Sequence, residues 1–69
     1  MEPTKEVKLA IIEAEINGIN NTIYQLQIRH RVNKKLGNDD ALKEIEKDMA
    51  KFETMLDEYE KIKAELDKN

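Results

Sequence analysis

The residues best suited to chemistry lie in one short stretch, YQLQIRHRVNKK, which runs from Tyr24 to Lys35. It combines an aromatic ring, amide groups and guanidinium groups, and such side chains stack on planar bases and neutralise phosphate. At helical spacing most of them fall on one flank, which Asn17 extends backward. The candidate ligand-binding residues are Asn20, Tyr24, Gln27, Arg29, His30, Arg31, Lys34 and Lys35.

A second explanation exists for the same basic residues. Cations are favoured in the last turn of a helix, where they face the negative end of its dipole. In an antiparallel assembly Glu2 and Glu6 of one copy could also pair with Arg29 or Lys34 of another. Ligand binding and pairing between subunits therefore both stay open at this stage.

Groups that could carry catalysis are scarce. The sequence has one His, no Cys, no Ser and no Gly-rich phosphate loop, so it predicts no catalytic residue, metal site or cofactor, and no enzyme. His30 is interpreted as a polar layer between helices with one edge in water. The acids after residue 38 alternate with Lys at helical spacing, as Glu44 does with Lys47, which indicates a solvated helix face.

The stretch must be positioned by helices, because apolar residues recur at alternating spacings of three and four. One helix is predicted at about 4–36, with Thr4 as its N-cap and Gly37 after its end, and another at about 39–67, with Asn38 as its cap. The apolar row continues through Asn17-Gly18 without a phase change, so this pair is interpreted as helical rather than as a turn.

The two apolar rows match each other across the short connection at 37–38. Residue numbers of facing positions add up to 75, from Leu9 with Leu66 at one end to Asn33 with Leu42 at the other. This register predicts an all-α fold, an antiparallel two-helix hairpin of coiled-coil type that forms a single domain over residues 1–69. The alternative is a three-helix arrangement broken at Gly18.

A second apolar row lies on the opposite side of the first helix. Because a helix that is apolar on two faces is usually covered on both, we expect this row to form an oligomer interface. Its residue numbers pair to 39, as two antiparallel copies of the helix require, with a two-fold axis between Ile19 and Asn20. The predicted interface comprises Val7, Ile11, Ala14, Gly18, Asn21, Gln25, Ile28 and Val32.

The centre of this row explains the unusual sequence INGINN. Gly18 and Ala14 are small enough to let two helices approach closely, and the Asn side chains can hydrogen-bond across the contact and select its register. We therefore expect a homodimer with four helices. A tetramer is the alternative, because Met55 and Ile62 broaden the apolar strip of the second helix.

Composition narrows the partners. The chain has 69 residues, a net charge of −3 and no apolar run long enough to span a membrane, so we expect a soluble, cytoplasmic protein that does not act at membranes. Its basic residues are too few for the phosphates that a duplex DNA complex neutralises. A small homo-oligomeric regulator, adaptor or inhibitor that binds a protein target is favoured. The alternative is binding of RNA or a nucleotide-sized ligand at the basic flank.

In size and layout the expected hairpin is similar to two groups of small helical proteins. One group comprises the short hairpin-dimer RNA-binding regulators of plasmids, and the other comprises phage proteins that block or sequester host factors. The likeness is one of architecture, and no residue motif carries a site over from either group.

Overall fold

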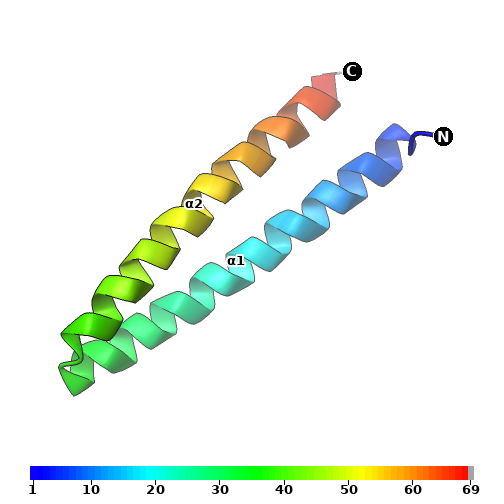
Figure 1. The fold of residues 1–69 in the computed structure, drawn as a ribbon. Coiled ribbons are helices and arrows are strands. Elements are labelled where there is room, and N and C mark those ends of the chain that lie inside the picture. Colours follow the sequence, from blue (N-terminus) through cyan, green and yellow to red (C-terminus); the bar gives the residue numbers. More distant parts are fainter. Residues whose placement is uncertain (69) are drawn as a thin grey trace.

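The computed structural model describes residues 1–68 as two antiparallel helices, α1 (Lys5–Leu36) and α2 (Asp39–Lys68). The chain runs along α1 to a tight tip and returns along α2, so that the start of α1 and the end of α2 lie at the same end of the rod (Figure 1). The molecule is a rod of 51 × 19 × 14 Å. The predicted all-α hairpin is therefore confirmed.

The ends of the helices follow from local hydrogen bonds. Thr4 has an extended backbone and its Oγ1 accepts a hydrogen bond from the Val7 amide at 3.3 Å, which caps α1. At the tip Gly37 adopts φ 69°, in the left-handed region that favours glycine.

The tip forms a Schellman motif. The Gly37 amide donates to the Lys34 carbonyl at 3.2 Å, and the Asn38 amide donates to the Asn33 carbonyl at 3.0 Å. Asn38 then starts the next helix, because its Oδ1 accepts from the Ala41 amide at 3.2 Å. One two-residue connection therefore ends α1 and caps α2, which leaves little freedom in how the helices leave the tip.

Helix α1 continues through Asn17-Gly18 without a break. Gly18 has no positive φ, and its carbonyl accepts a hydrogen bond from Thr22 Oγ1 at 3.0 Å, one turn further along the helix. The alternative of a three-helix arrangement broken at Gly18 is therefore wrong. The helical glycine costs about 1 kcal/mol relative to Ala, so its presence calls for an explanation outside this helix.

The core is the single seam between the helices, and all of its predicted positions are buried or half-buried. The most buried are Ile19 and Leu26, each 6% exposed, and Ile45, 8% exposed. Two side-chain contacts between polar groups cross the seam near its ends, His30 Nε2 to Glu46 Oε2 at 3.5 Å and the ion pair of Glu13 with Lys63 at 3.6 Å.

The residue numbers of each contact add up to 76, one more than the register predicted for the apolar layers. A shift of the pairing by a whole turn would separate these groups. The side-chain geometry therefore agrees with the predicted register along most of the rod. Over residues 1–68, neither helix is both long and apolar enough to cross a membrane.

Candidate functional site

The outer face of α1 is the side turned away from α2. At about 100° per residue its apolar row lies roughly opposite the seam. In the single chain Val7, Ile11, Ile28 and Val32 are 47–52% exposed, and the other four residues of the predicted interface are also exposed. Four β-branched aliphatic side chains along one face leave substantial apolar surface in water, which marks a surface suited to association.

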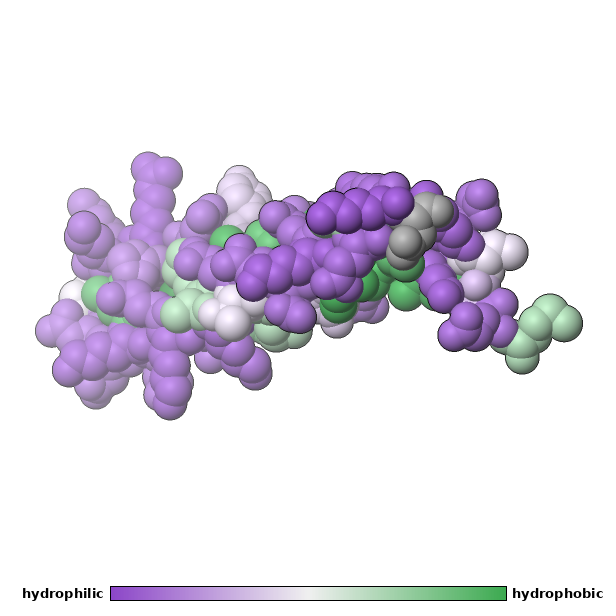
Figure 2. Space-filling view, turned by 90° about the horizontal axis from the view of Figure 1, so that it is seen from above, coloured by the Kyte–Doolittle hydropathy of each residue, from purple (hydrophilic) through white to green (hydrophobic). Residues whose placement is uncertain are grey.

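Figure 2 shows one side of the rod, coloured by the hydropathy of each residue. Hydrophilic side chains cover most of that surface, and hydrophobic groups are visible between them along its length. Within residues 1–68 no polar or charged residue is fully buried. The exposed apolar groups, rather than a buried polar cluster, are therefore the unusual feature of this surface.

The middle of the outer face has little side-chain bulk. A Cβ atom added to Gly18 would meet nothing within 4 Å, so packing inside the hairpin does not require glycine there. Ala14, one turn earlier, is also exposed. Since neither small residue is needed by α2, both leave room for something outside the chain to approach the α1 backbone.

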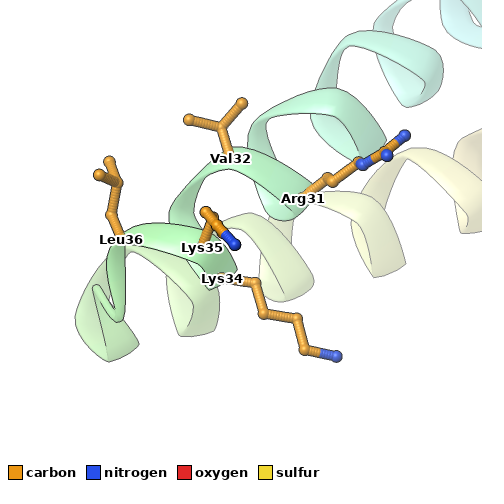
Figure 3. Close-up of a pocket in the computed structure, with 5 residues that line it drawn as sticks. All are labelled: Arg31, Val32, Lys34, Lys35 and Leu36. Atoms are coloured by element: carbon orange, nitrogen blue, oxygen red, sulfur yellow. The ribbon is translucent and has the colours of Figure 1, made fainter.

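Sequence reasoning missed one residue of this face. Leu36 is 73% exposed and lies one turn after Val32, so it extends the row to the tip. Figure 3 shows Val32 and Leu36 projecting from the same side of α1, whereas Lys34 projects away from them. The spacing of four residues signalled this extension, but Leu36 lies in the last turn and was counted as part of the helix end.

A shallow depression surrounds these two apolar side chains at the tip. Its lining comes from the last turns of α1 and mixes apolar and basic groups. The lining residues are Arg31, Val32, Lys34, Lys35 and Leu36. A second shallow depression lies on α2, between Met55, Glu58, Tyr59 and Ile62.

The candidate ligand-binding residues do not form one cluster. A set at spacings of four and three shares one flank of α1, namely Asn20, Tyr24, Gln27, Arg31 and Lys34. Arg29 lies about 200° around the helix from Arg31, on the other flank. His30 belongs to the seam, where its imidazole faces Glu46, and Lys35 lies toward the outer face.

Helix α2 places acidic groups beside that flank. Glu13 and Glu46 each reach across the seam to the other helix, so the rows that continue from them at seven-residue spacing follow the same edge of the hairpin. From Glu13 the row on α1 leads to Asn20, Gln27 and Lys34. From Glu46 the row on α2 contains only acids, Glu53, Glu60 and Asp67. This neighbourhood weakens the attraction of the flank for an anion.

The side chains of the described residues offer few groups for catalysis. No group of three or more His, Cys, Asp or Glu residues within positions 1–68 is arranged to hold a metal ion. The amide of Asn33, in the seam near the tip, bonds to the carbonyl of Arg29 at 2.8 Å and is satisfied within its own helix.

Comparisons with protein-family models, with curated proteins and with solved structures found no match to this chain. The geometry described above therefore carries the functional argument.

Proposed function

We propose that the protein is a non-enzymatic helical interaction module that works as a homodimer. Two hairpins pack through the outer faces of their α1 helices, which run antiparallel. Each α1 then lies between its own α2 and the α1 of the second copy. In this arrangement the dimer acts as a regulator, adaptor or inhibitor by presenting the outward surfaces of its helices to a protein target.

One observation carries the proposal, the symmetric pattern of the exposed row. Val7 and Val32 lie at equal distances from a midpoint between Ile19 and Asn20, as do Ile11 and Ile28, and both pairs are about half exposed. A two-fold axis at that midpoint places Val against Val and Ile against Ile in an isologous contact. Gly18, whose Cβ position is open, lies beside the axis, where close approach matters most.

Charge supports the antiparallel direction. Residues 1–19 contain four acids and two bases, whereas residues 20–36 contain four bases and no acid. Antiparallel packing places the basic half of each α1 beside the acidic half of the other, whereas parallel packing would bring the two basic halves together. The helix dipoles also favour the antiparallel direction.

The surface that the dimer offers to a target is mostly acidic. Residues 38–69 carry eleven acids and six bases, and α2 is covered only along its seam. Both α2 helices lie on the outside of the proposed dimer, so a protein target with a basic surface fits this arrangement better than a nucleic acid does.

Measurement of mass in solution tests the proposal. We expect sedimentation of the wild-type chain, of 8.1 kDa, to give twice that mass, and the double variant Ile11→Glu/Ile28→Glu to sediment as single chains. The matched control is Ala50→Glu/Ala64→Glu, two exposed positions on α2, which should leave the dimer intact. Single wild-type chains at about 100 µM, a concentration that detects even weak pairing, would contradict the proposal.

A mass of four chains that falls to two in Met55→Glu/Ile62→Glu would instead support the tetramer. These residues line the apolar depression on α2, so their substitution should act on the stacking of dimers and leave the contact between α1 helices in place. The same measurement thus separates the two assemblies.

A second candidate function is binding of RNA or a nucleotide-sized ligand on the flank of α1. It is favoured by Tyr24, which is 63% exposed and lies on the same flank as Arg31. Calorimetric titration with single-stranded RNA and with mono-, di- and cyclic nucleotides tests it. Heat that disappears in Tyr24→Ala and Arg31→Ala but persists in Arg29→Ala, on the other flank, would place this function first. No heat from any of these ligands would remove it.

A further inference from the structure

We infer that the depression at the hairpin tip is a docking site for the N-terminal segment, residues 1–4, of a second copy of the chain. The inference rests on the proposed homodimer. It adds that residues 1–4 of one copy cover the tip of the other copy, beyond the ends of the paired α1 rows. The dimer would then be closed at both ends by an exchanged segment.

The register of the proposed dimer brings the segment to this place. Val32, at the edge of the depression, pairs with the partner's Val7, and one turn further Leu36 falls opposite the partner's Pro3. Leu36 is the most exposed large apolar residue of the helices, and Met1 is the most exposed large apolar residue within residues 1–68. The contact would therefore cover both of these exposed side chains, Leu36 and Met1.

The backbone of the segment is suited to reach across the tip. Helix α1 starts at Lys5, and Thr4 is already extended, with ψ 165°. Residues 1–3 therefore rise at up to about 3.3–3.6 Å each instead of the 1.5 Å of a helix. The tip that receives the segment ends at Gly37 in a compact Schellman motif. No long loop at that tip therefore blocks the N-terminal segment of the other copy.

Charge complementarity selects this occupant over a generic apolar one. The depression carries three cations, Arg31, Lys34 and Lys35, around its two aliphatic side chains. The N-terminal segment and first helical turn carry two acids, Glu2 and Glu6, one base, Lys5, and the apolar Met1 and Pro3. An apolar contact with oppositely charged rims is the usual anatomy of a specific interface.

The existing contact of the segment within its own chain is weak. Glu2 lies 3.5 Å from Lys8 Nζ, but its side chain is 88% exposed. Surface ion pairs of this type contribute little, so exchange of Glu2 to the cations of a second copy loses little. The segment also has little apolar contact to give up in its own hairpin, since Met1 is fully exposed.

Disulfide trapping tests the docking, and a chain without Cys gives no background. The double variant Pro3→Cys/Leu36→Cys should form covalent dimers in a redox buffer. The bond cannot form within one chain, because α1 alone separates the two positions by about 1.5 Å per residue over 32 residues. Pro3→Cys/Ala50→Cys is the matched control and should remain uncrosslinked.

Trapping of Val7→Cys/Val32→Cys separates failure of this inference from failure of the dimer. If that pair crosslinks and Pro3→Cys/Leu36→Cys does not, the segment does not dock, and the dimer stands without it. If neither pair crosslinks and sedimentation gives single chains, the dimer and the docking both fall.

A non-covalent measurement complements the trapping. Leu36→Ser should leave the helicity of the hairpin unchanged, because this side chain is mostly in solvent, but should weaken dimerisation about tenfold. Glu2→Gln/Glu6→Gln should reduce the dependence of dimerisation on salt. Unchanged dimerisation in both variants would overturn the docking.

Discussion

The two helices differ on the faces that they turn away from each other. Helices α1 and α2 have similar lengths and share one seam, and residues at that seam are as little as 6% exposed. On α2 the opposite face is charged, with Asp57 and Lys61 one turn apart. On α1 the opposite face repeats the aliphatic pattern of the seam, but its side chains are about half exposed. In the proposed dimer α1 would therefore be the inner helix and α2 the outer one.

This difference fits the small size of the chain. One seam between two helices is a thin core for 69 residues, and chains of this size often gain stability by association. A second seam on α1 would add apolar layers without lengthening the chain. The variants below are ways to separate the contribution of the two faces of α1.

The largest effect should come from the seam itself. Leu26→Ala removes a side chain that is 6% exposed, and we expect a loss of about 2–5 kcal/mol in the free energy of unfolding. Circular dichroism should then show reduced helicity at every protein concentration. Ile28→Ala, on the outer face, is the control and should lower stability only where dimers form. Equal behaviour of the two variants at all concentrations would contradict the distinction between the faces.

The two glycines should respond to alanine with opposite signs. Gly37 needs its positive φ, so Gly37→Ala should destabilise the hairpin by about 1 kcal/mol. Gly18 is helical with open space around it, so Gly18→Ala should stabilise the separate hairpin by up to about 1 kcal/mol. Thermal unfolding at low concentration measures both.

At high concentration the Gly18→Ala variant should lose its advantage. The added methyl group stands beside the proposed two-fold axis and should separate the two α1 helices, weakening dimerisation by about tenfold, which is 1.4 kcal/mol. A variant that dimerises as tightly as wild type would show that close approach at Gly18 is not needed.

A smaller effect should follow from the polar layer of the seam. His30 is one-third exposed and faces Glu46 at 3.5 Å. We expect His30→Leu to stabilise the hairpin by up to about 1 kcal/mol, because apolar burial replaces a weak surface pair. Chemical denaturation measures the change, and Glu46→Gln isolates the contribution of the Glu46 carboxylate. A less stable His30→Leu would mean that the pair contributes more than its exposure implies.

The smallest effect should come from the ion pair at the other end. Glu13→Gln removes the contact with Lys63 at 3.6 Å, between side chains that are 56% and 40% exposed. The loss should stay below about 0.5 kcal/mol and decrease further in high salt. A larger loss in urea titrations at two salt concentrations would indicate that this end of the rod is held by charge rather than by the seam.

The sequence predicted the hairpin because its patterns are redundant. The apolar spacing, the caps at Thr4 and Asn38, Gly37 and the shared register all favour the same fold, and each is a short-range signal that a single chain must satisfy. The continuity of α1 through Gly18 was predictable in the same way, because the phase of the seam does not change there.

The surface was less predictable, because flank positions depend on the neighbouring helix as well as on their own. Sequence reasoning grouped Arg29 and His30 with Tyr24, although helix geometry places them on different sides. To predict that α2 places a row of acids beside Gln27, the register of both helices must be known at once. Leu36 was overlooked because a helix end and an interface end coincide there.

Since the start of α1 and the end of α2 lie at the same end of the rod (Figure 1), tension applied between them would not load all the layers at once. The layer nearest the ends would open first, and the others would follow one by one toward Gly37, as in a zipper. Such a geometry yields at low force even where its thermal stability is high, so the hairpin is suited to opening from its ends and poorly suited to bearing a load through them.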